Sequence, residues 1–291
     1  MTVQPLTFVH MTDLHVNAPG VSDDMLFSDT TETLKRTLSE IKRMAERPAF
    51  IVASGDLTNH GEPEAYATVA GIFEEAALDI PVLFALGNHD RREGFVVGFS
   101  DLHQDASQPY DHDSVMNGLH VIVLDSSVPD EIGGYWEAGQ MDWLRARLAD
   151  HADLPKLLVM HHAPMVAEEA PEMAEMEWES LSLAATNELR DAIKGANIVG
   201  ILSGHVHLDR VHHWHGIPVV IGMGHHAATD AVALPDAFHM LDGTGFAICT
   251  LRPSGLTATF AAHPQSREIR KTLNMQMLLE YIEQRKAAAA E

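Results

Sequence analysis

The chain has 291 residues, 46% hydrophobic and 21% charged, a composition typical of a globular protein with a large core. Its 42 acidic residues against 19 basic ones give a formal net charge of −23, so we expect neither nucleic acid nor a membrane as a partner. No apolar run is long enough to cross a membrane, and the N-terminus does not resemble a signal peptide. Together with the single cysteine, which excludes an internal disulfide framework, this predicts a cytoplasmic location.

Short apolar runs alternate with segments of helical periodicity, which is the pattern of an α/β domain. The first helix is well defined, because Asp29 and Glu32 have capping-box spacing ahead of an apolar face. In chain order, the expected elements are strand Leu6–Met11, a helix after Asp29, strand Phe50–Ala53, a helix from Pro63, strands Val82–Leu86 and His120–Leu124, helix Gln140–Leu148, strand Leu157–Met160, helix Asn187–Lys194, and strands Ile198–Leu202, Ile217–Ile221, Phe246–Leu251 and Thr257–Ala261.

We expect one domain over residues 1–270 and an amphipathic helical tail over residues 271–291. Residues 166–186 and 225–245 are predicted to be loops on the substrate side, because ligand sites in open α/β sheets lie beyond the carboxyl ends of the strands. The tail is interpreted as a packing or dimer helix, which makes a homodimer reasonable. The alternative for the tail is a lid over the site.

Successive predicted strands end in metal-binding side chains. Asp13 and His15 are two positions apart, as are His205 and His207, and in extended backbone such residues point to the same side, roughly 6.5–7 Å apart. Two neighbouring metal ions need a shared carboxylate, and Asp56 is the acid available at its strand end. The residues at the strand ends, none of them a cysteine, are Asp13, His15, Asp56, Asn88, His89, Asp90, His161, His162, His205 and His207.

These motifs resemble those of the calcineurin-like metallophosphoesterases over residues 6 to about 225. The resemblance is strongest to the bacterial branch of class III cyclic nucleotide phosphodiesterases, which also contains glycerophosphodiesterases. It implies an α/β fold in which a two-sheet sandwich is flanked by helices in four layers, with the metal site at the strand ends. The motifs are Asp13-x-His15, Gly55-Asp56-Leu57-Thr58-Asn59, Gly87-Asn88-His89-Asp90, His161-His162-x-Pro164 and Gly204-His205-x-His207.

The resemblance also implies a centre of two metal ions, Fe or Mn paired with Mn or Zn, and Co suits the same donors. A hydroxide bridging the ions would attack phosphorus in line with the leaving oxygen. His89 would stabilise or protonate the leaving group, and Asp90 would orient its ring. The implied ligands are Asp13, His15 and His207 for the first metal, Asn88, His161 and His205 for the second, and Asp56 bridging both.

Other polar residues near the motifs have two interpretations each. His162 either supports the preceding ligand or lines the pocket. Arg91 and Arg92 either contact phosphate or are solvated surface residues. His225 and His226 follow a predicted strand and are as compatible with substrate contact as with packing. The histidines of the predicted hairpin are expected to be scaffold; they are His212, His213 and His215.

The function that the sequence supports best is a dinuclear metal phosphodiesterase whose substrate is a small phosphodiester, namely a 3′,5′- or 2′,3′-cyclic nucleotide. Glycerophosphodiesters, nucleotide pyrophosphates and phosphomonoesters are alternatives, because the metal core is common to all of them. An exonuclease is disfavoured by the acidic charge and the lack of a basic, aromatic-rich track. A non-catalytic interaction module is disfavoured because no predicted ligand is replaced.

Overall fold

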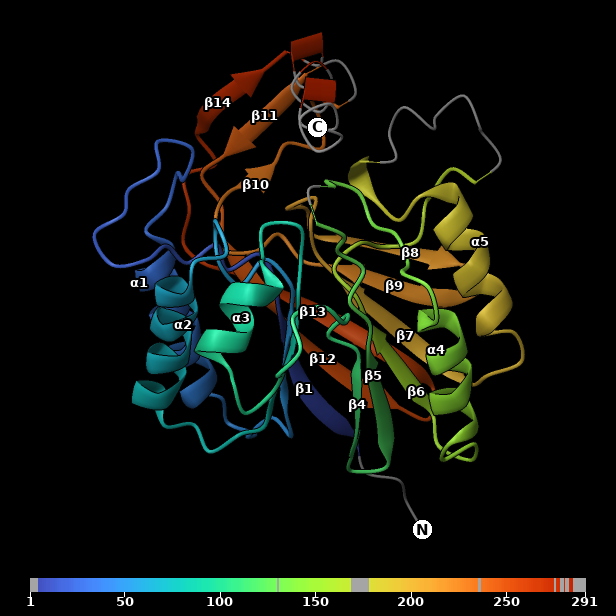
Figure 1. Cartoon of the computed structure of the whole chain (residues 1–291). Helices are drawn as coiled ribbons and strands as arrows, with labels where there is room; N and C mark the ends of the chain where they lie inside the picture. The colour runs from blue at the N-terminus through green and yellow to red at the C-terminus, as the bar shows by residue number, and fades with distance from the viewer. Residues whose placement is uncertain are drawn as a thin grey trace.

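The computed structural model describes residues 5–129, 131–168, 178–234, 237–274, 276–277, 280 and 283–284. Two large β-sheets pack against each other, helices cover both outer faces, and a small third sheet lies at one end (Figure 1). This is the four-layer α/β arrangement that the family resemblance implies. Within the described part of the chain, no helix combines the length and the apolar character needed to span a bilayer.

The first large sheet has five strands in the order β13-β12-β1-β2-β3. Because β1, β2 and β3 run parallel, their carboxyl ends meet at one edge of the sheet. Helices α1, α2 and α3 pack on its outer face (Figure 1). Its elements are β1 (Leu6–Met11), α1 (Thr30–Lys42), β2 (Ile51–Ser54), α2 (Pro63–Ala76), β3 (Val82–Ala85), α3 (Arg92–Gly98), β12 (Gly245–Arg252) and β13 (Gly255–Ala262).

The second large sheet has six strands in the order β4-β5-β6-β7-β9-β8. Strands β5, β6, β7 and β9 are parallel, so this sheet also gathers its strand ends at one edge. Helices α4 and α5 pack on its outer face (Figure 1). Its elements are β4 (His112–Met116), β5 (Leu119–Val123), α4 (Gln140–Ala149), β6 (Lys156–Val159), α5 (Leu183–Ala192), β7 (Ile198–Ser203), β8 (Arg210–Trp214) and β9 (Ile217–Ile221).

The inner part of strand β1 is buried on both faces, which explains why apolar residues occupy successive positions at Phe8 and Val9 instead of alternating with polar ones. Phe8 belongs to the apolar layer between the two sheets and stacks on Phe50, with ring centroids 4.7 Å apart. Its neighbours Val9 and Met11 belong instead to the layer under the helices. The strand also buries one polar ring, His10, whose Nε2 is 2.8 Å from Oγ of Ser54 at the end of β2.

The predicted start of the first helix is confirmed, because the Asp29 side chain accepts a 3.0 Å hydrogen bond from the N–H of Glu32. The predicted start of α5 at Asn187 is wrong. The helix begins at Leu183, because the hydroxyl of Ser182 caps it by accepting a 3.1 Å hydrogen bond from the N–H of Ala185.

The third sheet occupies part of a predicted loop and the start of the predicted tail helix. It has three strands in the order β10-β11-β14, namely β10 (Ala228–Thr229), β11 (Phe238–Leu241) and β14 (Ile269–Leu273). Leu273 pairs with Phe238, so the helix expected from residue 271 does not begin there. This pairing joins segments that are far apart in the chain, so it cannot be predicted from the local periodicity of either segment.

The reactivity of the Cys249 thiol reports on the packing between the two large sheets. Its thiol is fully buried in that layer, and burial raises its pKa to about 12. Because the thiolate is the reactive form, we expect the folded protein to react with Ellman's reagent no faster than it unfolds, and the denatured protein to react at once. Comparing thiol release with and without guanidinium checks this, and rapid labelling of the folded protein would contradict it.

Candidate metal centre

Asp56 follows β2 and lies in the middle of the predicted ligand set. Its Oδ2 atom is 3.3 Å from Nε2 of His161 and 3.6 Å from Nε2 of His15. Its Oδ1 atom accepts a 2.8 Å hydrogen bond from the backbone N–H of His89. His161 follows a strand of the second sheet and His15 a strand of the first. Asp56 therefore faces ligands from both sheets, as a bridging carboxylate must.

Asp13 follows β1 and faces the remaining histidines. Its Oδ1 atom is 3.3 Å from Nε2 of His207, and both of its oxygens accept a 3.1 Å hydrogen bond from the backbone N–H of His205. Nε2 of His207 is also 3.2 Å from Nε2 of His15. Two nitrogens at about 2.1 Å from one ion, at roughly 90–110° to each other, lie about 3.0–3.4 Å apart. His15 and His207 are therefore spaced to share one ion.

The predicted histidine ligands each use one ring nitrogen to bind an acceptor away from the carboxylates. Nδ1 of His161 is 2.9 Å from the carbonyl oxygen of Ser54, and Nδ1 of His207 is 3.1 Å from that of Ala227. Because a carbonyl oxygen only accepts, Nδ1 carries the hydrogen in both rings. The lone pair is left on Nε2, which is the atom that faces the carboxylates.

The other two predicted histidine ligands follow the same rule. Nε2 of His205 is 2.6 Å from the carbonyl oxygen of Trp178, which leaves the lone pair on Nδ1. Nδ1 of His15 is 3.3 Å from Oδ1 of Asn59, which leaves the lone pair on Nε2. Metal-binding histidines almost always donate their second nitrogen in this way, because the bond fixes the tautomer and the ring orientation.

Two of the predicted ligand atoms are buried and have no hydrogen-bond partner: Oδ1 of Asn88 and Nε2 of His161. A buried polar atom left unpaired costs about 1–3 kcal/mol, and a coordinated ion would supply the missing partner. Imidazole, carboxylate and amide donors without thiolate suit Fe, Mn, Zn or Co. The residues present therefore fit the dinuclear centre that the family implies.

The electrostatics of the cluster also favour cations. Burial alone would raise the pKa of Asp56, but the imidazoles of His161 and His89 outweigh it and hold that pKa well below its usual range. The pKa of Asp13 is lowered in the same way against its burial, mainly by His207. Burial would lower the pKa of His161, but the two carboxylates raise it to about 9. Positive charge is thus stabilised between Asp13 and Asp56.

The backbone at the ligands is left-handed, not extended. The φ angle is +50° at Asp13, +45° at His15, +77° at His205 and +49° at His207. The prediction that these pairs use the spacing of extended backbone is therefore wrong, because tight turns beyond the strand ends bring them together. Non-glycine residues in such conformations cost of order 1–3 kcal/mol each and concentrate at functional sites.

Two glycines allow the ligand turns to approach one another. A Cβ atom on Gly87 would lie 2.3 Å from Oδ1 of Asp56. A Cβ atom on Gly204 would lie 1.9 Å from Oγ1 of Thr12 and 2.4 Å from Oδ2 of Asp13. Any side chain at either position would displace a predicted metal-binding carboxylate.

His162 lies among the ligands but is not one of them. Its ring is close enough to His161 and His205 for a shared ion, yet both of its nitrogens are already bonded. Nδ1 is 2.9 Å from Oγ of Ser126, and Nε2 is 3.0 Å from the carbonyl oxygen of Ile132. Since the side chain is also fully buried, His162 supports the ligand rings and does not line the pocket.

His89 and Asp90 do not form the predicted pair. Nδ1 of His89 donates instead to the backbone carbonyl of Asn59, at 2.9 Å. The carboxylate of Asp90 turns under the loop, where burial and the charge of Asp56 raise its pKa to about 7. It accepts hydrogen bonds from the N–H groups of Leu57, Thr58 and Gly87 and from the hydroxyls of Thr58 and Tyr66. Asp90 therefore ties the two ligand loops together.

A cavity of about 210 Å³ opens beside Asn88, and Arg91 and Arg92 both line it. The interpretation of Arg92 as a solvated surface residue is wrong. Its side chain is buried and donates to Asp125 at 2.8 Å and to Glu137 at 2.6 Å, which makes it a structural ion pair. Arg91 is half-buried beside the predicted leaving-group histidine.

The two histidines after β9 have different surroundings. His225 is fully buried, with Nε2 3.1 Å from Oγ1 of Thr37 on α1, and its N–H donates to the carbonyl of Asp13 at 3.0 Å. The interpretation of His225 as a substrate contact is therefore wrong, because its buried ring packs against α1 while its backbone N–H supports the Asp13 loop. His226 lies beside the histidines of the first metal.

Most of the groups that orient the histidines have no signature in the sequence. Three of the acceptors are backbone carbonyls, at Ser54, Trp178 and Ala227, and a backbone carbonyl has no side-chain signature. Asn59 is the exception, because it is the last residue of the motif Gly55-Asp56-Leu57-Thr58-Asn59. Its side chain and its carbonyl orient two different histidines.

The sequence profile of the calcineurin-like phosphoesterases matches residues 6–209. Among curated proteins, the chain is 36% identical over 216 residues to a probable cyclic nucleotide phosphodiesterase of Rhodococcus erythropolis, an alignment that covers 73% of this chain and 68% of that protein. It is 32% identical over 223 residues to a cAMP/cGMP dual specificity phosphodiesterase of Mycobacterium tuberculosis, with 73% and 65% covered. The chain thus matches about two thirds of the length of these relatives.

Among solved structures, purple acid phosphatase PPD1 from yellow lupin (Lupinus luteus) seeds matches with a TM-score of 0.63 and 11% sequence identity. The match covers 94% of this chain and 54% of that one. At this level of identity the likeness concerns the fold alone.

Replacing the central carboxylate tests the geometry of the centre. We expect Asp56→Ala to lose at least one of two bound metal ions per chain, because its Oδ2 faces histidines from both sheets. Plasma mass spectrometry on Mn²⁺-loaded protein measures this. The control is His213→Ala, an exposed histidine on β8 that should leave the metal content unchanged. Full occupancy of both positions in Asp56→Ala would rule out the bridging role.

Proposed function

The chain belongs to the calcineurin-like phosphoesterase family, and from this membership we propose that it is a metal-dependent phosphodiesterase acting on a small diester, a 3′,5′- or 2′,3′-cyclic nucleotide. The observation that carries the proposal is the convergence of oriented histidine lone pairs on Asp13 and Asp56, with His89 beside them. The similarity to proteins named as cyclic nucleotide phosphodiesterases supports the substrate class. A cavity of about 210 Å³ is smaller than the roughly 300–1,000 Å³ of most ligand pockets, which suits a small substrate.

Two bound ions would activate water near neutral pH and stabilise the charge that develops on the phosphoryl oxygens. The nitrogen and oxygen donors suit Fe, Mn, Zn or Co, and the family resemblance implies Fe or Mn paired with Mn or Zn. Cys249, within β12 in the core, offers no thiolate to the centre. The holding residues are Asp13, His15 and His207 for the first ion, Asn88, His161 and His205 for the second, and Asp56 for both.

The chain's own residues would bind and orient the diester. His89 keeps its Nδ1–H on the carbonyl of Asn59, so as an imidazolium it would donate the remaining proton, on Nε2, to the leaving oxygen and become the neutral imidazole. Arg91 lines the cavity next to Asn88, where a guanidinium is suited to hold a phosphoryl oxygen through paired N–H donors. The cavity would then hold the part of the substrate that does not react.

The substrate class is tested by competition. We expect Mn²⁺-loaded protein given 3′,5′-cyclic AMP, 2′,3′-cyclic AMP and glycerophosphocholine together to open a cyclic nucleotide fastest, with initial rates followed by chromatography. Preference for glycerophosphocholine would keep the metal centre and change the substrate to phospholipid headgroup diesters. No hydrolysis of any of the three would contradict the proposed function.

His89 is tested by His89→Asn, which removes the acid–base group and keeps a polar side chain. We expect the variant to retain its metal and to lose kcat by roughly 10²–10⁴-fold, the usual contribution of one such group. Steady-state kinetics with parallel metal analysis measures both quantities, and His213→Asn on β8 serves as the matched control. Unchanged turnover would remove His89 from the mechanism.

A further inference from the structure

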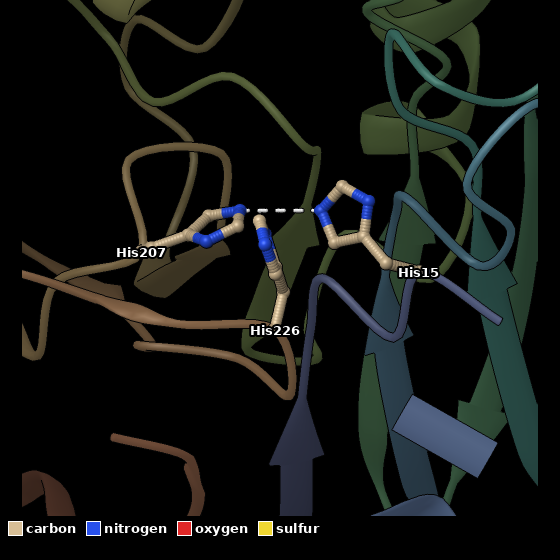
Figure 2. A group of neighbouring side chains, drawn as sticks. All are labelled: His15, His207 and His226. Atoms are coloured by element: carbon tan, nitrogen blue, oxygen red, sulfur yellow. Dashed lines mark hydrogen bonds between the residues drawn. The ribbon is translucent and has the colours of Figure 1, made fainter. Parts of the chain in front are cut away.

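His226 lies in the loop after β9 and completes a cluster of three imidazoles at the first metal position. Its ring centroid is 5.2 Å from that of His15 and 5.2 Å from that of His207. Figure 2 shows the His226 ring reaching toward the gap between the other two rings. A ring nitrogen of each residue lies within 4.8 Å of one on both others.

The spacing of the three nitrogens suits a single ion. His15 and His207 already have the separation of two neighbouring ligands, at 3.2 Å. Two nitrogens on one ion, each at about 2.1 Å, are at most roughly 4.2 Å apart. Ring nitrogens of all three residues lie within 4.8 Å of one another, so His226 stands beside a pair that already has the spacing of two ligands.

His226 is also oriented like a ligand. Its Nε2 is 2.6 Å from the carbonyl oxygen of Met25, so Nε2 carries the hydrogen and the lone pair stays on Nδ1. This is the arrangement of the four predicted histidine ligands, each of which binds a carbonyl oxygen with one nitrogen and keeps the other. It differs from that of the structural residue His162, in which both nitrogens are bonded.

The ring of His226 is held from one side by Phe27. The two rings stack with centroids 5.6 Å apart and an interplanar angle of 16°. An imidazole that is oriented by one carbonyl and stacked on one aromatic ring has little freedom to turn away from its neighbours. Pre-oriented ligands of this kind lose little entropy when they bind an ion.

Resting on the proposed metal centre, we infer that His226 is a third imidazole ligand of the first metal ion, beside His15 and His207. A site with three imidazoles favours ions that prefer nitrogen donors, such as Fe²⁺, Co²⁺ and Zn²⁺, over the oxygen-preferring Mn²⁺ and Mg²⁺. The first position is therefore selective for a nitrogen-preferring ion, and the loop that carries His226 sets this selectivity.

The test is the variant His226→Phe, which keeps a ring against Phe27 and removes the nitrogen. We expect its affinity for the first Co²⁺ ion to fall by at least about 10–100-fold, the scale found even for residues that only orient a ligand, with a smaller loss for Mn²⁺. Titration followed by the visible d–d bands of Co²⁺ measures affinity and geometry together. His213→Phe is the control, because it makes the same exchange at an exposed histidine on β8 and should keep the wild-type affinity and bands.

A second measurement uses the unaltered protein, in case His226→Phe does not fold. The ¹H NMR spectrum of the dicobalt protein should show five strongly shifted imidazole N–H signals, from His15, His161, His205, His207 and His226. Four such signals, or wild-type cobalt affinity and bands in a folded His226→Phe, would overturn the inference. If the protein hydrolyses no diester but shows five signals, the proposed function fails and the ligand inference stands. If the protein hydrolyses a diester but shows four signals, the ligand inference fails and the proposed function stands.

Discussion

The metal centre depends on one repeated hydrogen bond, an imidazole N–H donated to a carbonyl oxygen on the side of the ring away from the carboxylates. Without it, each ring could change tautomer or turn, and the lone pairs would not meet at Asp13 and Asp56. The acceptor for His161 is the carbonyl of Ser54, the last residue of β2. A strand of the first sheet thus orients a ligand from the second, so the chemistry of the site requires the two sheets to be packed together.

The same packing supports the strained turns that carry the ligands. Left-handed φ angles at residues such as Asp13 and His207 are unfavourable for a side chain with a Cβ atom and persist only where the surroundings enforce them. Here the N–H of His205 donates a hydrogen bond to the carboxylate of Asp13. Gly204 permits this close approach because it has no Cβ atom. Asp90, with its donors from both ligand loops, does the same for the Asp56 turn.

The sequence predicted the strands and the residues that follow them, because short, mainly apolar runs marked the strands and metal-binding side chains followed several of them. It did not predict the backbone at those residues, and the extended spacing assumed for Asp13 and His15 was wrong. Tertiary partners explain the other differences. The family resemblance implied that Asp90 orients His89, whereas the fold gives His89 the carbonyl of Asn59. His225 and His226 looked equivalent in sequence, and only packing against α1 separates them.

The histidine acceptors fall into two groups with different consequences. Ser54 belongs to a central strand, and its position is fixed by the core. Trp178, Ala227 and Met25 lie outside the strands and α-helices, and their carbonyls orient His205, His207 and His226. The orientation of these three histidines therefore depends on segments outside the large sheets, whereas that of His161 is set by the core. A change in one of these segments is expected to turn a predicted ligand without disturbing the core.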